Sequence, residues 1–353
     1  MTLAPRWKNR PPGSNWGDFG PDDQAGRLNL ITREKVLQGI AEVSQGLSFN
    51  LSLPLDVPGG NVLNPRRHPP VLRPTLRNEQ PNMNYALCVD DPAHTDVVSD
   101  DLVILHTQYS TQWDSLAHVG SLFDADGDGI KESVYYNGYR ANTDIRCETE
   151  ASGAGIFTQS PIAQGSTSHA QALGIEKMSE RCVQGRAVMI DLRAHLGASR
   201  VVVDYATLAD ILARDAIDIE PGDMVCLHTG FADTLLSMNR KPDAAALANC
   251  GAVLDGRDPN LLDWITRSGL SVLIADNYAV EAHPVSPQAG CYATLPLHEH
   301  CLFKLGIHLG ELWHLTPLAH WLRSNRRYRF LLTAPPLRLP GAVGSPVTPI
   351  ATV

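Results

Sequence analysis

The segment HTQYSTQWDSLAH, residues 106–118, gathers side chains of the kinds that bind metal ions. Gln112 and Asp114 are two positions apart, so on a strand they would point to the same face. Gln108 precedes them by a short turn, and His118 follows the aspartate by four residues. A loop at the end of such a strand could bring all four side chains to one point. Amide and carboxylate oxygens with one imidazole would favour Mn²⁺ or Mg²⁺ over Zn²⁺.

The same residues have a simpler explanation, because Gln and Asp near a strand end often cap it, hydrogen-bond the backbone or face water. Other histidines near predicted strand ends, His106, His228 and His283, are further candidates for contact with a substrate. For each of these histidines, an ordinary structural role is the alternative.

A second acidic pattern, DADGDG at residues 124–129, looks like the opening of a calcium-binding loop. Asp124, Asp126 and Asp128 stand at its first, third and fifth positions. The twelfth position should carry a bidentate glutamate but is Tyr135, and no helical pattern flanks the loop. The sequence therefore predicts a surface turn here, with an adventitious calcium site as the alternative.

The composition limits the class of protein. The chain has 353 residues, of which 43% are hydrophobic and 19% charged, as in an ordinary globular protein. Its net charge of −9 argues against a nucleic-acid partner, since phosphate binding needs clustered Lys and Arg. No run approaches the roughly 18 apolar residues of a membrane span, and no secretory signal is visible. Seven scattered cysteines without a CxxC pair indicate reduced thiols, so we expect a cytoplasmic protein without a membrane partner.

Helical and strand-like patterns alternate over the second half of the chain, which predicts an α/β protein with a mixed sheet. No linker or repeat divides the sequence, so we expect a single domain over residues 1–353, with an extended N-terminal arm over about 1–30. Residues 57–83, rich in Pro, Asn and Arg, are expected to form a long functional loop. The predicted helices are 33–46, 204–217 and 259–269, the predicted strands include 47–55, 185–197 and 222–231, and 270–282 is predicted to be a strand that runs into a loop.

Gln108, Gln112, Asp114 and His118 form a QxxxQxDxxxH pattern that resembles the HxxxHxDxxxH motif of the metal-dependent cyclase family. That family includes bacterial kynurenine formamidase and isatin hydrolase. With glutamine in place of both leading histidines, the pattern is most similar to that of trans-dienelactone hydrolase, a branch that opens lactones with manganese. Further segments match the family in the same order, namely SNWGDFGPDDQAGRLNLIT, YYNGY, GRAVMIDLRAHLG, GDMVCLHTGF and LHEHCLFKLGIHLGELWHL.

The resemblance implies a swivelling β/β/α cyclase-type fold with a mixed sheet, assembled as a homodimer or homotetramer. It also implies that His298 and Glu311, thirteen residues apart, are the second pair of site residues. Trp16, in the N-terminal arm, is a candidate to line the pocket of a partner subunit, and Trp113 and His228 are candidates to contact the substrate.

The ligands implied by the resemblance are Gln108, Gln112 and Asp114, with His118 as a fourth ligand or as the general base. Mn²⁺ is the preferred ion and Zn²⁺ the alternative. His298, oriented by Glu311, could protonate the leaving group or could itself bind the metal.

The expected activity is metal-dependent hydrolysis of a lactone or cyclic amide of a small molecule, through metal-activated water. The alternatives are an arylformamidase, a cyclase or dehydratase acting on a polyketide-like acid, and a protein that kept the fold without catalysis. A serine nucleophile and a nucleotide cofactor are unsupported, since the sequence has no GxSxG, GxGxxG or Walker pattern.

Overall fold

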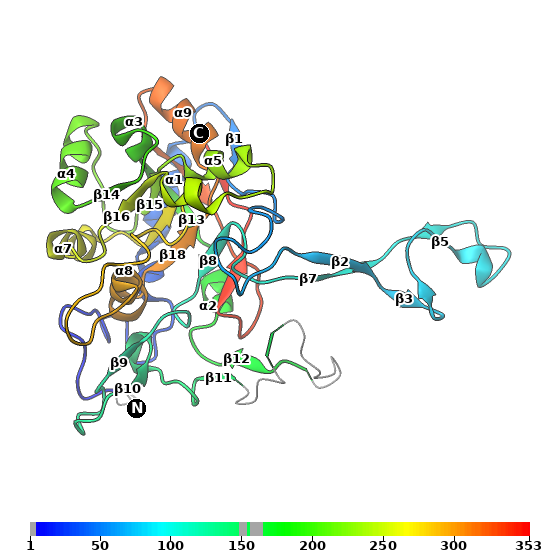
Figure 1. Cartoon of the computed structure of the whole chain (residues 1–353), viewed down its shortest axis with the longest axis horizontal. Helices are drawn as coiled ribbons and strands as arrows, with labels where there is room; N and C mark the ends of the chain where they lie inside the picture. Colours follow the sequence, from blue (N-terminus) through cyan, green and yellow to red (C-terminus); the bar gives the residue numbers. More distant parts are fainter. Residues whose placement is uncertain (1–4, 148–153, 156–164) are drawn as a thin grey trace.

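A computed structural model describes residues 5–147, 154–155 and 165–353, so the first four residues of the predicted N-terminal arm lie outside it. Over the described residues the chain forms a nine-stranded sheet whose four central strands are parallel and whose outer strands are antiparallel (Figure 1). This confirms the predicted α/β class with a mixed sheet. In order across the sheet, the strands are β1 (Ser48–Asn50), β21 (Ile350–Thr352), β19 (Arg329–Thr333), β13 (Gln184–Asp191), β15 (Met224–His228), β17 (Val272–Ala275), β18 (His308–Glu311), β8 (Gln112–Asp114) and β20 (Gly344–Pro346).

The central strands are buried on both faces, which is why their sequences are continuous apolar runs. In β17, Val272 and Ile274 pack into one hydrophobic cluster, whereas Leu273 and Ala275 pack into the cluster on the opposite face. The strand period of two therefore divides the core into two layers, one on each side of the sheet.

Helices cover both faces, and several begin at a side-chain cap. Asp204 caps α4 by accepting a hydrogen bond from the backbone of Thr207, and Asp258 caps α7 in the same way from Asn260. No helix of the described residues has the length and apolar character needed to cross a membrane. The helices are α1 (Arg33–Ala41), α2 (Ile175–Glu180), α3 (Leu192–Leu196), α4 (Tyr205–Arg214), α5 (Phe231–Ser237), α6 (Ala244–Ala248), α7 (Pro259–Ser268), α8 (Pro296–His298), the π-helix η6 (Glu299–Leu305), α9 (Thr316–Ser324) and the short 3₁₀ turns η1 (Gly26–Leu30), η2 (Leu87–Val89) and η3 (Tyr136–Gly138).

Several predicted strands are shorter in the structure: 47–55 contains only the short strand β1. The segment 185–197 was expected to be a single buried strand, but β13 ends at Asp191 and α3 follows directly. The carboxylate of Asp191 accepts a hydrogen bond from the backbone of Ala194, so it caps the helix and stops the strand.

The N-terminal segment folds back on its own chain. Trp16 is 1% exposed, and its indole nitrogen donates a 2.8 Å hydrogen bond to the carbonyl of Phe303. Its ring meets those of Phe123 and Phe303 edge-on, with centroids 6.0 and 5.2 Å away. Trp16 is therefore part of the core of its own chain, and its contact with the pocket of a partner subunit stays a prediction.

A long two-stranded extension leaves the body of the molecule (Figure 1). This projecting arm, residues 71–104, is built from the hairpin pairs β2 (Val71–Pro74) with β7 (Asp101–Ile104), β3 (Leu76–Arg77) with β4 (Gln80–Pro81), and β5 (Tyr85–Ala86) with β6 (Val97–Val98). Its exposed apolar side chains are those of Val71, Leu72, Leu76, Met83, Val89, Val97, Leu102, Val103 and Ile104. The remaining small sheets pair β9 (Ser121–Phe123) with β10 (Glu132–Val134), β11 (Ile145–Cys147) with β12 (Ser168–Ala170), and β14 (Val201–Val203) with β16 (Ala252–Leu254).

An isolated two-stranded ribbon is marginally stable in water, and large exposed apolar patches mark association surfaces. We therefore expect the projecting arm to pack against a second copy of the chain, as the predicted homodimer or homotetramer requires. Light scattering should give at least twice the mass of one chain. The double variant Leu72→Ser, Leu76→Ser should shift the protein toward the monomer, whereas Leu122→Ser, at an equally exposed position on β9, should not. A monomeric wild type would contradict this expectation.

Candidate metal centre

Gln112 and Asp114 lie on β8, between β18 and β20, whereas Gln108 precedes this strand and His118 follows it. In the antiparallel pairing of β8 with β18, Gln112 stands opposite Glu311 and Asp114 stands opposite Leu309. Because strand side chains alternate, Gln112, Asp114 and Glu311 project from one face of the sheet, and Trp113 projects from the other.

Trp113 is part of the hydrophobic core. Its ring packs edge-on against that of Trp313 at a centroid distance of 5.0 Å, and its nitrogen donates to the carbonyl of Ala334 at 2.8 Å. Gly310 lies directly opposite on β18, where an added Cβ would lie 3.1 Å from the Trp113 ring and 2.9 Å from the Trp313 nitrogen. The prediction that Trp113 contacts substrate is therefore wrong, because it shares neither the face nor the surroundings of Asp114.

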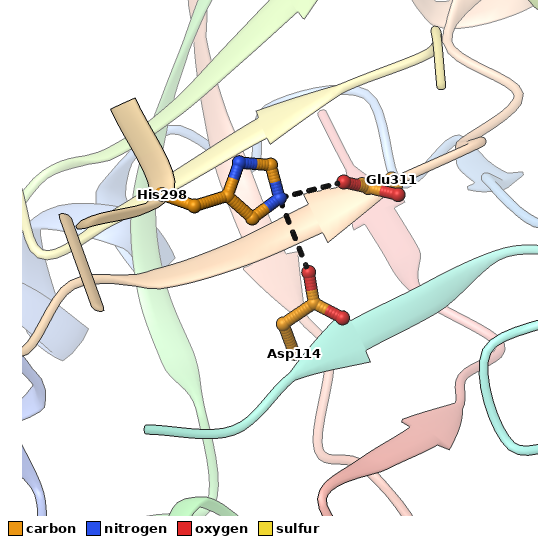
Figure 2. A group of neighbouring side chains, drawn as sticks. All are labelled: Asp114, His298 and Glu311. Atoms are coloured by element: carbon orange, nitrogen blue, oxygen red, sulfur yellow. Dashed lines mark hydrogen bonds and ion pairs between the residues drawn. The ribbon is translucent and has the colours of Figure 1, made fainter. Parts of the chain in front are cut away.

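His298 completes the site from α8. Its Nε2 lies 3.3 Å from Glu311 Oε1 and 4.0 Å from Asp114 Oδ2, and all three side chains are buried (Figure 2). One ligand atom from each lies within 4.8 Å of the other two, a spacing at which a single metal ion could be held. We call these residues, Asp114, His298 and Glu311, the Asp–His–Glu site.

Glu281 fixes the orientation of His298. Its carboxylate accepts a 2.7 Å hydrogen bond from His298 Nδ1 and two further bonds from the backbone nitrogens of Leu297 and His298. With Nδ1 held in this way, Nε2 is the nitrogen that faces Asp114 and Glu311. A carboxylate behind the histidine is the usual support of a metal-binding imidazole.

The two glutamines bind the carboxylates through their amide nitrogens. Gln112 Nε2 donates to Glu311 Oε2 at 3.0 Å, and Gln108 Nε2 donates to Asp114 Oδ1. Gly344, which pairs with Asp114 on β20, leaves the space that the Gln108 side chain fills. The prediction that the amide oxygens of both glutamines bind the ion stays a prediction.

Two buried oxygens of this group, Asp114 Oδ2 and Gln112 Oε1, have no hydrogen-bond partner within the described part of the chain. A buried carboxylate oxygen without a partner is costly. A divalent cation between Asp114, His298 and Glu311 would satisfy the carboxylate, and the nearby amide oxygen could add a ligand. Two carboxylates and one imidazole are a donor set that Mn²⁺ and Zn²⁺ both accept. The residues therefore fit a divalent ion.

The charges of the surrounding residues also favour a cation at the centre of the Asp–His–Glu site. Burial, the largest influence, lowers the pKa of His298, but the hydrogen bonds and charges of Glu281 and Glu311 outweigh it and raise that pKa to about 10. Burial raises the pKa of Asp114, and the charge of Glu311 adds to the rise. A cation at the centre of the site would relieve both effects, since it would neutralise the carboxylates without a proton.

His118 lies at the edge of the site, four residues after Asp114. Its ring centroid is 6.5 Å from that of His298. Burial lowers the pKa of His118, and the charge of Asp114 opposes this only in part, so the imidazole is neutral at pH 7. Among the described residues, the group with ligand spacing contains Asp114, His298 and Glu311 but not His118.

His228 is fully engaged elsewhere. Its Nδ1 lies 2.8 Å from Asp191 Oδ1 and its Nε2 lies 3.0 Å from Thr316 Oγ1, and the ring is 1% exposed. With both ring nitrogens bonded to side chains of its own chain, it has no free nitrogen to offer a substrate. The prediction of a substrate contact at His228 is therefore not supported by its position.

The acidic turn is a separate feature. Asp124 accepts hydrogen bonds from the backbone nitrogens of Gly127, Asp128 and Gly129, so its carboxylate closes the loop. Asp126 and Asp128 lie close enough to it for a metal ligand group, but Asp124 and Asp126 are only half-buried and Asp128 is exposed. The arrangement is the surface turn that the sequence predicted.

A narrow pocket of about 10 Å³, room for about one water, lies beside Gln108 and is lined by Asn64, Arg67, Gln108, Tyr109 and Tyr278 together with apolar neighbours. Leu63 and Tyr278 also line an adjoining cavity of about 240 Å³, whose other walls include Phe231, Leu247 and Val253. Gln108 contacts Asp114, so the polar end of this pocket reaches the Asp–His–Glu site.

Comparisons with known proteins point to one family. The model of the cyclase family, described as "Putative cyclase", matches residues 49–282. A solved structure called a novel cyclase is 28% identical, with a TM-score of 0.71 and coverage of 98% of this chain and 100% of its own. Isatin hydrolase A from Labrenzia aggregata is 12% identical, with a TM-score of 0.52 and coverage of 90% of this chain and 97% of its own. An isatin hydrolase bound to the product analogue thioisatinate is 12% identical, with a TM-score of 0.53 and coverage of 91% of this chain and 99% of its own. No curated protein matches the chain.

Removing the carboxylate behind His298 should weaken metal binding without removing a ligand. We expect Glu281→Gln to bind Mn²⁺ about 10–100-fold more weakly than the wild type, measured by calorimetry on chelator-treated protein. Glu299→Gln is the matched control, because Glu299 is next to His298 in sequence but bonds to Ser121 instead. Equal Mn²⁺ affinity in wild type and a folded Glu281→Gln would refute the role given to Glu281.

Proposed function

The chain belongs to the cyclase family, and from that premise we propose that it is a metal-dependent hydrolase that opens a lactone or cyclic amide. The observation that carries the proposal is the Asp–His–Glu site itself, with a buried Asp114 oxygen that lacks a partner next to a pocket. Isatin hydrolases share the fold, and isatin is a cyclic amide. This supports a ring carbonyl as the bond that is attacked.

Asp114, His298 and Glu311 would hold the ion, with Mn²⁺ preferred over Zn²⁺ because oxygen donors predominate. A bound divalent ion supplies Lewis acidity, which polarises a carbonyl and lowers the pKa of water. Gln108 and Gln112 keep the two carboxylates in place through their amide nitrogens. His298 acts here as a ligand and not as an acid, because Glu281 holds its Nδ1 and its Nε2 faces the carboxylates.

We assign proton transfer to His118 as part of this proposal. Its neutral imidazole lies beside His298 and outside the ligand group, so a ring nitrogen can accept a proton from the attacking water. The same nitrogen can return that proton to the ring oxygen or nitrogen that leaves when the substrate opens. The substrate ring would occupy the cavity walled by Phe231, Leu247 and Val253, and Tyr278 stands between this cavity and the narrow pocket beside Gln108.

Metal removal tests the activity. Incubation with EDTA followed by desalting should abolish hydrolysis of γ- and δ-lactones, and added Mn²⁺ should restore it. A pH-stat should record one proton released per turnover, since ring opening of a lactone liberates an acid. Activity that survives complete chelation would exclude the proposal, and turnover without acid release would favour a dehydratase instead.

The proton-transfer role of His118 predicts a pH profile. Burial lowers the pKa of His118, so the base stays unprotonated down to below its ordinary value of 6.5. The wild-type rate should therefore fall only as the pH drops below that value. His118→Gln should lower kcat about 10²–10⁴-fold and remove this acid limb while keeping its Mn²⁺. A variant with an unchanged acid limb would assign the titration to another group.

A further inference from the structure

Two consecutive residues just before Glu281 have a strained backbone. Ala279 and Val280 have φ angles of +75° and +57°, in the left-handed region that residues with a Cβ rarely adopt. Val280 is β-branched and fully buried, which makes its conformation the more unusual of the two. Strain of this kind persists only where surrounding contacts hold it, and it is common at functional sites. We call residues 277–281 the left-handed turn.

The left-handed turn ends at the residue that orients His298. Glu281 is buried and accepts the hydrogen bond from His298 Nδ1. Leu254, on β16, holds the main chain on either side of Glu281. Its backbone nitrogen donates to the carbonyl of Val280 at 3.1 Å, and its carbonyl accepts from the backbone nitrogen of Ala282 at 2.9 Å. The position of the Glu281 carboxylate behind His298 therefore depends on how the turn is attached to β16.

The side chain of Asn277 attaches the other end of the turn. It is 2% exposed, its Oδ1 accepts a 3.1 Å hydrogen bond from the backbone nitrogen of Val280, and its Nδ2 donates a 2.8 Å bond to the carbonyl of Ala252 on β16. Alanine at this position could form neither bond and would leave a buried N–H and a buried carbonyl without these partners, which is costly. The amide therefore closes the turn across its two left-handed residues and fixes it to β16.

The main chain of Asn277 reaches the strand that carries the other carboxylate ligand. Its carbonyl accepts a 3.0 Å hydrogen bond from the backbone nitrogen of Leu312, the residue after Glu311. Leu312 is also left-handed, with φ +57°, and its own carbonyl accepts a 2.5 Å bond from the hydroxyl of Thr111. Asn277 thus contacts both the turn that carries Glu281 and the residue that follows Glu311.

We propose that Asn277 is a positioning residue of the Asp–His–Glu site. Its side-chain amide bonds to Val280 and Ala252 and not to a ligand, so it acts by holding the left-handed turn that places Glu281 behind His298. This inference rests on the proposed metal-dependent function. Asn277 also lines the cavity assigned to the substrate ring, so direct contact with the substrate is the alternative that the test must separate.

Mn²⁺ affinity, measured by calorimetry on chelator-treated protein, tests the inference. Asn277→Ala should bind Mn²⁺ about 10–100-fold more weakly than the wild type, the loss typical for residues that support metal ligands. Ala279→Gly should leave the wild-type affinity unchanged, because glycine adopts the left-handed conformation without steric cost. Added to Asn277→Ala, the same glycine should restore most of the lost affinity, since the turn then depends less on the amide.

Asn137→Ala is the matched control for the loss of a buried amide. Asn137 is also fully buried, but its side chain bonds to the backbone of residues 17–23. This variant should lose thermal stability and keep its Mn²⁺ affinity. Equal losses of affinity in Asn137→Ala and Asn277→Ala, with no rescue by Ala279→Gly, would reduce Asn277 to a general role in stability and overturn the inference.

Two other outcomes would also overturn it. A folded Asn277→Ala with wild-type Mn²⁺ affinity would remove Asn277 from positioning, and a raised KM in that variant would make it a substrate contact instead. If Asn277→Ala does not fold, the double variant with Ala279→Gly decides. Mn²⁺ binding by the folded double variant supports the inference, and its failure to fold or to bind overturns it.

The affinities separate the inference from the activity. If the expected pattern of Mn²⁺ affinities holds while no lactone is hydrolysed, the hydrolase proposal fails and the role of Asn277 stands. If Mn²⁺-dependent hydrolysis is found but the pattern of affinities is not, the role of Asn277 fails and the hydrolase proposal stands. A wild type that binds no Mn²⁺ would contradict both.

Discussion

The structure depends on the burial of three carboxylates around one imidazole. Asp114, Glu281 and Glu311 are at most 4% exposed, and His298 stands between them. Removing charges from water is costly, and the cost is offset only where hydrogen bonds and opposite charge replace the solvent. Each carboxylate accepts hydrogen bonds: Asp114 from Gln108, Glu311 from Gln112, and Glu281 from the backbone of α8. The group still carries more negative than positive charge, and a divalent ion would balance it.

The fold supplies these residues from distant parts of the chain. Gln112 and Glu311 are 199 positions apart, and they meet because β8 inserts between β18 and β20. On the far face of the inserted strand, Trp113 packs against Trp313 in the core, and Gly310 leaves the space for both rings. On the near face, α8 brings His298 down onto the strand ends (Figure 2). A rigid sheet thus carries two of the three ligands, as the geometry of a metal ion demands.

Much of the fold and part of the metal centre could be predicted from the sequence. The helical patterns at 204–217 and 259–269 predicted α4 and α7 to within a few residues, because amphipathic patterns and Asp caps are local signals. The family resemblance gave His298 and Glu311, which no spacing rule would join to Asp114. Trp113 was misplaced because its neighbours on the strand are site residues, although the strand period of two sends it to the opposite face.

Other features had no local signal. Glu281 lies in an irregular segment, and its role appears only when α8 folds against it. Trp16 and His228 were assigned to a pocket, but their partners Phe303, Asp191 and Thr316 come from other elements of the chain. The segment 57–83 was expected to be one loop, whereas its second part is the start of the projecting arm. Its first part does reach the site, through Arg67.

The most direct test of the metal centre is elemental mass spectrometry on protein purified without added ions or chelator. The wild type should carry about one divalent ion per chain, mainly manganese, and Asp114→Ala should carry almost none. Asp124→Ala, which removes a carboxylate from the surface turn, should keep the wild-type amount. A wild type without metal, or an Asp114→Ala variant with as much metal as the wild type, would contradict the assignment of the ion to the Asp–His–Glu site.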